Sequence, residues 1–460
     1  MRRLATITAS ILLAGFVLAA EPAATDVPAG YISEVLPNGL QVSILPEPSN
    51  PVVATQVWYH VGAAHEEPRT RGFAHLFEHL MFGGTAQHPA RDYPEHHRRF
   101  GGYENAYTSW DETVYISAIP PDGHAAVLAL EADRMVNLRL DQQNLDNEQR
   151  IVTEELRVST ENDPFTRVGV AALKAVLGEH PYAITPAGTK EDIAAATLAH
   201  AREFYARYYR PQNAHVVIVG PVDGAATLER VRADFGALEP AGETPAEIPA
   251  LVDWQLAERV ELSEDLPPVE IAILGYALPP ADSPERPALE LMTQLLAGGQ
   301  VDPFEEELVR RRNKAVEAAT TFIDLRRGGA LVFYSAALPY RREASAFRFM
   351  DETREVLARL EWLTEESLAA AKRKLVRREL NQAYFADERA GAIGRARWWQ
   401  GDERLAFSRA AAIEAVSRED VAAAFRRYVV EREPARVYLK PLRVPLLVRL
   451  FGWVYPLVSR

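Results

Sequence analysis

The sequence of 460 residues contains no cysteine. This absence excludes disulfide bonds, an N-terminal cysteine that carries a lipid anchor, and thiolate ligands for a metal ion. Any metal site in the chain must therefore be built from histidine and carboxylate side chains.

Basic residues are too few to balance the acidic ones, since 51 Lys and Arg stand against 64 Asp and Glu and leave a net charge of −13 at pH 7. A phosphate-binding surface needs an excess of Lys and Arg, and the sequence has neither a P-loop nor a G-x-G-x-x-G motif. We therefore expect no nucleic-acid partner and no nucleotide chemistry. The shares of hydrophobic (48%) and charged (25%) residues are those of an ordinary globular protein, long enough for two or three packed cores.

A long apolar run is also missing. The chain begins with a basic Met1-Arg2-Arg3, and the apolar stretch at 4–18 that follows is too short to cross a membrane comfortably before Ala19 and Ala20. A basic start, a short apolar segment and small residues at its end are typical of a cleaved secretory signal. We predict a signal peptide over residues 1–20 and an exported, periplasmic protein, with a retained membrane anchor as the alternative.

The other end of the chain, residues 441–460, combines arginines, prolines and aromatic residues with only short apolar runs. This composition argues against a transmembrane helix. Such a tail either contacts a membrane surface, docks on a partner or packs back on its own domain, and the sequence leaves these alternatives open.

Histidine is scarce, with 11 copies, yet two of them lie four residues apart in the run His75-Leu76-Phe77-Glu78-His79. On a helix with 3.6 residues per turn these two side chains share a face, so both can reach one metal ion. The run is H-x-x-E-H, the reverse of H-E-x-x-H, in which two histidines bind zinc and the glutamate acts as base on a zinc-bound water. The alternative is a polar helix face with two incidental histidines.

Three segments recur along the chain at nearly constant offsets. Residues 51–61 correspond to 268–278 at an offset of 217, residues 73–85 to 288–300 at 215, and residues 205–221 to 425–441 at 220. The repeated parts indicate a strand, a buried helix that ends at glycines, and a helix end followed by a strand. We therefore predict a duplicated chain of two α+β domains.

The second copy has Glu290, Thr293 and Gln294 where the first has its two histidines and their glutamate, so only the first copy can bind zinc in this way. A run rich in Pro, Glu and Ala separates the copies and indicates a linker. The expected division is a zinc-binding catalytic domain at 21–240, a linker at 241–254, a homologous domain without the zinc motif at 255–440 and the tail at 441–460.

Two histidines leave a catalytic zinc site one protein ligand short, since such a site usually takes three protein ligands and one water. Residues 147–157 indicate a helix rich in carboxylates. Glu148 and Glu155 are two turns apart and share a face, whereas Glu154 is rotated by about 100° from Glu155. The third ligand is expected among these acids.

With these residues the chain resembles the pitrilysin/insulinase-type zinc peptidases, a group that includes the mitochondrial processing peptidase, from about residue 30 to 440. In that family the motif is followed about 75 residues later by a ligand glutamate, and here 155 − 79 = 76. The resemblance implies Zn²⁺ as cofactor, Glu155 as third ligand with Glu154 as the fallback, and Glu148 as a supporting acid that orients a ligand. It also implies that each domain is a mostly antiparallel sheet flanked by helices.

The stretch at 100–116 extends the resemblance. In relatives the strand that carries Asn105 and Ala106 is a sheet edge that pairs with an extended substrate. An exposed edge offers backbone donors and acceptors to any peptide. Asn105 and Ala106 are therefore the expected substrate contacts, and an ordinary hairpin is the alternative.

One part of the family pattern is incomplete. Self-sufficient relatives carry an Arg and, seven residues later, a Tyr in the second domain, and this pair helps to stabilise the tetrahedral intermediate. Arg310 stands at the Arg position, but Glu317 takes the place of the Tyr, and a solvated basic turn at 310–312 is the alternative to a catalytic Arg310. Because losing one such donor costs roughly a hundredfold or more in rate, we expect a heterodimer with a related subunit that lacks the zinc motif and supplies the Arg/Tyr pair.

The sequence thus indicates an exported zinc endopeptidase for extended or unfolded peptides, with zinc held by His75, His79 and Glu155 and with Glu78 as general base. The alternative is a non-catalytic scaffold or peptide-binding subunit of the same family. A base beside the site argues against a purely structural zinc, which usually has four protein ligands. A zinc hydrolase for a different substrate is a third hypothesis, and the edge strand favours peptides.

Overall fold

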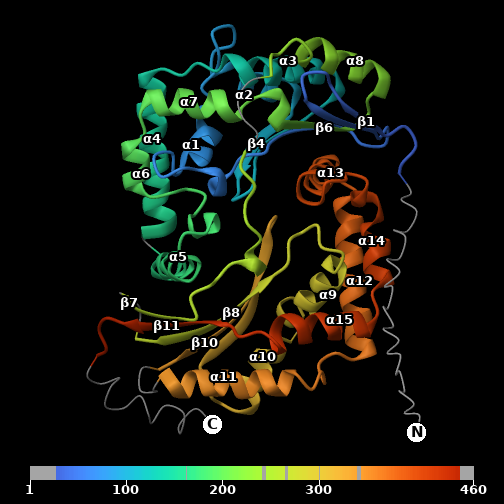
Figure 1. The fold of residues 1–460 in the computed structure, drawn as a ribbon. Coiled ribbons are helices and arrows are strands. Elements are labelled where there is room, and N and C mark those ends of the chain that lie inside the picture. The colour runs from blue at the N-terminus through green and yellow to red at the C-terminus, as the bar shows by residue number, and fades with distance from the viewer. Residues whose placement is uncertain are drawn as a thin grey trace, which may run out of the picture.

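The computed structural model describes residues 27–161, 163–240, 245–264, 268–299, 301–338 and 343–445. The predicted signal peptide, the start of the predicted linker and residues 446–460 of the tail lie outside the described residues. Two sheets with their helices form two halves, one above the other in Figure 1. None of the helices in the described part is both long and apolar enough to cross a membrane.

The first half contains a six-stranded sheet with the order β1-β2-β6-β3-β5-β4, in which only β2 and β6 are parallel neighbours. Its strands are β1 (Ile32–Val35), β2 (Gln41–Pro46), β3 (Val53–Tyr59), β4 (Tyr103–Thr108), β5 (Thr113–Ile119) and β6 (Ala214–Gly220). Its α-helices are α1 (Phe73–Leu80), α2 (Asp92–Phe100), α3 (Pro121–Asn137), α4 (Gln142–Leu156), α5 (Pro164–Leu177), α6 (Lys190–Ala195), α7 (Leu198–Tyr208) and α8 (Gly224–Phe235). Shorter turns are η1 (Ala63–His65), η2 (Arg157–Glu161), η3 (Pro181–Ala183), η4 (Pro211–Asn213) and η5 (Leu251–Asp253).

The second half contains a five-stranded sheet with the order β7-β11-β8-β10-β9, in which only β7 and β11 are parallel neighbours. Its strands are β7 (Arg259–Glu264), β8 (Glu270–Leu278), β9 (Glu317–Leu325), β10 (Gly328–Ala337) and β11 (Ala435–Pro441). Its α-helices are α9 (Arg286–Ala297), α10 (Pro303–Glu305), α11 (Glu343–Leu357), α12 (Glu365–Gln382), α13 (Ala386–Gln400), α14 (Leu405–Ala415) and α15 (Arg418–Phe425), with the helical turns η6 (Glu306–Arg311) and η7 (Arg426–Val430).

The two sheets have the same topology. In the order given, β7, β11, β8, β10 and β9 take the places of β2, β6, β3, β5 and β4, and the parallel pair occupies the same place in both. The repeat in the sequence therefore corresponds to a structural repeat, as predicted. The α+β class with mostly antiparallel sheets flanked by helices is confirmed.

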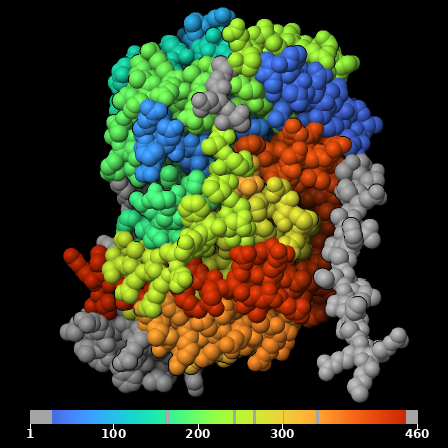
Figure 2. Space-filling model, viewed as in Figure 1, coloured from blue at the N-terminus to red at the C-terminus, as the bar shows by residue number. Residues whose placement is uncertain are grey.

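The halves exchange helices across their boundary. Helix α13 of the second half packs on β3 and β6 of the first sheet, where Ile393 joins the core around Trp58 and Val217. In return, Val168 and Ala172 of α5 pack on the second sheet. Figure 1 shows α13 below the first sheet and α5 above β7 and β11. The space-filling view in Figure 2 shows the two halves in contact. This exchange explains why β3 is buried along its whole length.

The part of the predicted linker that is described, residues 245–254, packs between the halves. Ile248 and Leu251 are buried in a core that contains Tyr182 from the first half and Leu325 from the second. The backbone N–H of Leu251 also donates to the carbonyl of Arg327. The prolines in this run prevent a long helix, while its apolar residues fix it in place.

Candidate metal centre

Helix α1 presents the paired histidines because its other side is apolar. Phe73, Ala74, Leu76, Phe77 and Leu80 are buried in the core of the first half. Since side chains three and four residues apart share a face, burying these residues leaves the polar positions at 75, 78 and 79 on the opposite face.

The start of α1 is held by an acid that sequence reasoning missed. The carboxylate of Glu66 accepts hydrogen bonds from the backbone N–H groups of Gly72 (2.7 Å) and Ala74 (2.8 Å). These N–H groups have no partner within the helix, and Gly72, at φ 78°, adopts a left-handed conformation that favours glycine. Glu66 therefore fixes the orientation of the helix that carries the histidines.

Helix α4 brings Glu155 to the histidines. Its N-cap is Asp141, whose side chain accepts from the N–H of Asn144, and Leu145 and Val152 anchor it in the core beside α1. One donor atom from each of His75, His79 and Glu155 lies within 4.8 Å of the others. Glu155 Oε1 is 3.8 Å from His75 Nε2, and its Oε2 is 3.5 Å from His79 Nε2.

This donor set fits zinc. Two imidazoles and one carboxylate form a ligand set of catalytic zinc sites, and donor atoms about 2 Å from a tetrahedral ion are about 3.3 Å from one another. The separations of 3.5 and 3.8 Å are slightly wider than that. Burial also lowers the pKa of His75, opposed by the nearby carboxylates of Glu78 and Glu155, and a neutral ring is the form that binds a metal.

Two other acids of α4 differ in what they contact. Glu148 Oε2 is 3.6 Å from His79 Nδ1, the ring nitrogen that faces away from Glu155. Burial raises the pKa of Glu148, and His79 lowers it. Glu154, the fallback ligand, forms an ion pair with Arg157 at 2.6 Å instead. His75 has no support like that of Glu148, since its buried Nδ1 has no hydrogen-bond partner among the described residues.

Glu78 lies on the same face of α1 and is oriented by the edge strand. The hydroxyl of Thr108, the last residue of β4, donates to Glu78 Oε2 at 2.7 Å. Sequence reasoning did not find this contact, because the two residues are 30 positions apart and only the packing of β4 beside α1 brings them together. The other carboxylate oxygen of Glu78 does not take part in this hydrogen bond.

Strand β4 is the outermost strand of its sheet. It pairs with β5 on one side, with Asn105 opposite Ile116 and Ala106 opposite Tyr115, and no strand of the described residues pairs with its other side. Its backbone groups on that side are thus available to an added strand. That Asn105 and Ala106 contact a substrate stays a prediction.

The structure gives Arg310 local partners. It is 58% exposed and forms ion pairs with Glu305 (3.4 Å) and Glu306 (3.7 Å) of its own helical segment, an arrangement that matches a solvated basic turn. Glu317, at the position of the expected Tyr, accepts a hydrogen bond of 3.0 Å from Tyr334 of the neighbouring strand β10. A tyrosine is therefore present near this position, although not at the spacing found in self-sufficient relatives.

The counterpart of the metal site in the second half is an ion-pair network. Glu290, which replaces the first histidine, is buried and accepts from Arg286 (2.6 Å) and Arg409 (2.9 Å). Thr293 donates its hydroxyl to the carbonyl of Glu290. These residues stabilise α9 and leave no cluster of metal-binding side chains there within the described residues.

Comparison with known proteins identifies the family of this chain. Residues 42–185 match the family model described as Insulinase (Peptidase family M16), and residues 195–375 match the Peptidase M16 inactive domain. The chain is 30% identical over 353 residues to the zinc protease PqqE of Helicobacter pylori, a match that covers 76% of this chain and 78% of that protein. The chain belongs to peptidase family M16. This confirms the predicted insulinase-type family.

Other M16 relatives cover more of the chain. An uncharacterised zinc protease of Mycobacterium tuberculosis, Rv2782c, is 28% identical over 421 residues, which are 91% of this chain and 94% of that protein. A crystal structure of a protease from Helicobacter pylori superposes with a TM-score of 0.79 at 27% identity and covers 89% of this chain and 99% of that one. The first half of the periplasmic protease PqqL from Escherichia coli has the same fold, with a TM-score of 0.69 at 20% identity, covering 91% of this chain and 93% of that one.

Proposed function

We propose that this chain is a zinc-dependent endopeptidase that hydrolyses extended or unfolded peptides, with His75, His79 and Glu155 as zinc ligands and Glu78 as general base. The observation that carries the proposal is the convergence of donor atoms from these three ligands within 4.8 Å. The family and the names of its zinc-protease relatives support the same assignment.

Glu78, Thr108 and strand β4 each have a role in this reaction. When bound, zinc polarises the scissile carbonyl and lowers the pKa of a coordinated water. Glu78 accepts the proton of the attacking water and passes it to the leaving amine. Thr108 holds one oxygen of Glu78 at 2.7 Å, and the free edge of β4 aligns the peptide as an added strand. Backbone pairing favours extended peptides with little dependence on their side chains.

We also propose that a partner subunit supplies the oxyanion donor and that the protein is exported to the periplasm. Arg310 is engaged with Glu305 and Glu306, which supports a heterodimer in which a related subunit supplies the Arg/Tyr pair. The sequence pattern at residues 1–20 and the name of the periplasmic relative PqqL support export to the periplasm. If the purified chain alone cleaved unfolded peptides as fast as a mixture with such a subunit, the heterodimer would be wrong.

Replacing Glu78 with Gln tests the reaction itself. The variant keeps the size of the side chain and the hydrogen bond from Thr108 but removes the base. We expect it to bind one equivalent of zinc with unchanged affinity and to lose at least about a hundredfold in peptide hydrolysis. A variant that retained full turnover would exclude Glu78 as the base. A wild-type protein that bound zinc but cleaved no peptide, even with its partner, would favour the scaffold alternative.

A further inference from the structure

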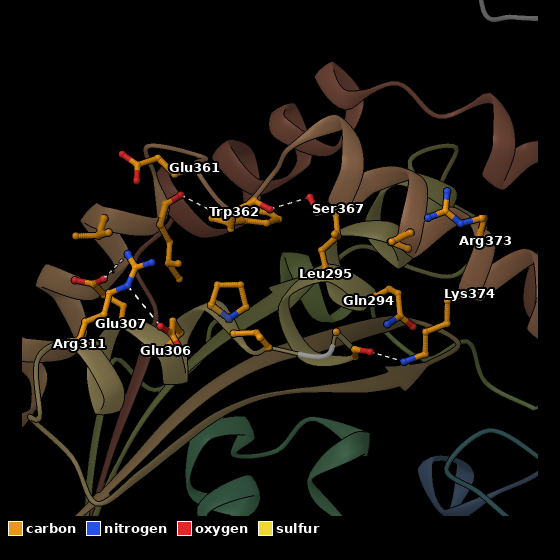
Figure 3. Close-up of a pocket in the computed structure, with 18 of the residues that line it drawn as sticks. Gln294, Leu295, Glu306, Glu307, Arg311, Glu361, Trp362, Ser367, Arg373 and Lys374 are labelled. Atoms are coloured by element: carbon orange, nitrogen blue, oxygen red, sulfur yellow. Dashed lines mark hydrogen bonds and ion pairs between the residues drawn. The ribbon is translucent and has the colours of Figure 1, made fainter.

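A cleft of the second half lies between α9 and α12. It has a volume of about 980 Å³, at the upper end of the range for ligand pockets. Gln294 and Leu295 of α9 line one side, and α12 lines the other. Figure 3 shows Trp362 between two groups of charged side chains, with Arg373 and Lys374 at one end and Arg311 beside Glu306 and Glu307 at the other.

This cleft lies between the helices that correspond to α1 and α4 of the candidate metal centre. Gln294 corresponds to His79 at the offset of 215. Helices α4 and α12 also match: each begins at an N-cap, Asp141 or Thr364, and buries the residues four and eleven positions later. In this alignment the pair Glu154–Glu155 corresponds to Arg377–Arg378. Basic residues thus replace acidic ones on the helix that lines the cleft.

The free positive charge of the cleft lies at one end. Arg373 and Arg377 are one turn apart and exposed, and within the described part of the chain neither forms an ion pair or a hydrogen bond. Lys374 donates to the carbonyl of Gly298, which leaves its charge without a carboxylate. At the other end, Glu306 and Glu307 are neutralised by the arginines at 310–312. Glu361 also lines the cleft, is exposed and has no ion pair among the described residues.

The middle of the cleft is apolar. Leu295, Val356, Leu357 and Trp362 line it, and the indole N–H of Trp362 is already satisfied by the carbonyl of Leu357 at 2.9 Å. A ligand that fits must therefore bring negative charge to one end and apolar groups to the centre. A peptide with acidic residues next to a large apolar side chain has this chemistry, because its carboxylates complement the basic end of the cleft.

We propose that the α9–α12 cleft binds an acidic peptide segment, with its carboxylates on Arg373, Lys374 and Arg377 and an adjacent apolar side chain against Trp362. Carboxylates form charge-assisted, often bidentate hydrogen bonds with guanidinium groups. Binding at this cleft requires neither zinc nor hydrolysis, so the proposal stands apart from the endopeptidase function.

The test is a binding titration with the full chain that carries Glu78→Gln, which prevents cleavage. The probe is a fluorescently labelled decapeptide with three consecutive acidic residues beside Leu-Phe, and its anisotropy is compared with that of a peptide with Asn and Gln in place of the acids. We expect saturable binding of the acidic peptide that is tighter than any binding of the neutral peptide along the edge of β4. This difference should shrink as the salt concentration rises from about 50 to about 300 mM, because exposed charges are screened.

Matched variants locate the site. Arg373→Ser combined with Arg377→Ser is expected to weaken binding by about three- to tenfold, since each exposed ion pair contributes a small factor. Arg378→Ser is the control, because Arg378 lies on the same helix, pairs with Glu379 and does not line the cleft. Unchanged thermal unfolding of the Glu78→Gln parent, the double variant and the Arg378→Ser control shows that all three remain folded. Equal binding of both peptides, equal loss in the control, or binding of anionic phospholipid vesicles in place of the peptide would overturn the proposal.

Discussion

Thr108 connects two parts of the candidate site that lie on different elements. It ends the edge strand β4, and its hydroxyl donates to the carboxylate of Glu78 on α1. A peptide added to β4 would therefore lie beside a base whose orientation depends on the same strand.

Replacing Thr108 separates orientation from binding. Thr108→Val removes the hydroxyl and keeps the shape, so Glu78 loses its fixed orientation; we expect kcat to fall by roughly tenfold with little change in KM or in zinc affinity. Thr108→Ser should restore most of the rate because it returns the donor. Steady-state kinetics on a quenched peptide, with zinc content measured on the same samples, provide the comparison. A rate in Thr108→Val equal to that of the wild type would contradict the positioning role.

The sequence predicted part of the site at this scale. The spacing within α1 identifies His75, Glu78 and His79 without any structure, because helical periodicity relates neighbours along the chain. Only the family resemblance favours Glu155 over Glu154, since rotation about a helix does not say which face meets α1. Thr108 and Glu66 act through contacts between segments that no local pattern relates.

At the scale of the element, a helix cap supports the candidate metal centre. Glu66 caps α1 through two backbone N–H groups, so it supports the helix that carries two of the three proposed ligands. Caps of this kind are worth about 0.5–2 kcal/mol.

Replacing Glu66 tests this link. Glu66→Ala is expected to lower the free energy of unfolding by about 1–2 kcal/mol and also to weaken zinc binding, because the first turn of α1 frays. Asp223→Ala is the control, since Asp223 caps α8, which carries no proposed ligand. Urea unfolding and competitive zinc titration measure the two quantities. If both variants lost stability and neither lost zinc affinity, the cap would have no role in the site.

The repeat in the sequence predicted which strands and helices correspond, and the structure places them in the same order in both sheets. It did not predict the exchange of α5 and α13 between the halves. An amphipathic pattern shows that a helix buries one face, but the sheet that covers this face depends on the path of the whole chain.

At the scale of the whole molecule, the halves are joined by polar contacts as well as by the exchanged helices. Trp398 of α13 stacks on His60 with ring centroids 3.9 Å apart, and its indole N–H donates to the carbonyl of Asp111 at 3.0 Å. The buried carboxylate of Asp111 accepts from the backbone N–H of Arg326 and the hydroxyl of Tyr182. The turn that follows β4 is therefore held in place by residues of the second half.

Two glycines of α13 test the docking of this helix. A Cβ at Gly394 would lie 2.3 Å from the indole ring of Trp58, whereas a Cβ at Gly391 would meet Gln56 at an ordinary 3.7 Å. We expect Gly394→Ala to destabilise the protein by about 1–3 kcal/mol through overpacking. Gly391→Ala should be neutral or stabilise it by up to about 1 kcal/mol through helix propensity. Thermal unfolding compares them, and equal effects would show that α13 does not dock as described.

X-ray absorption spectroscopy at the zinc edge, on protein loaded with one equivalent of Zn²⁺, tests the metal centre most directly. We expect two imidazole nitrogens and one carboxylate oxygen at about 2.0–2.2 Å, with a water oxygen as the fourth ligand. Glu155→Gln should change this spectrum and weaken zinc binding, while Glu154→Gln, which removes the partner of Arg157, should leave both as they are. A spectrum with one imidazole or none, or one altered by Glu154→Gln and not by Glu155→Gln, would contradict the proposed site.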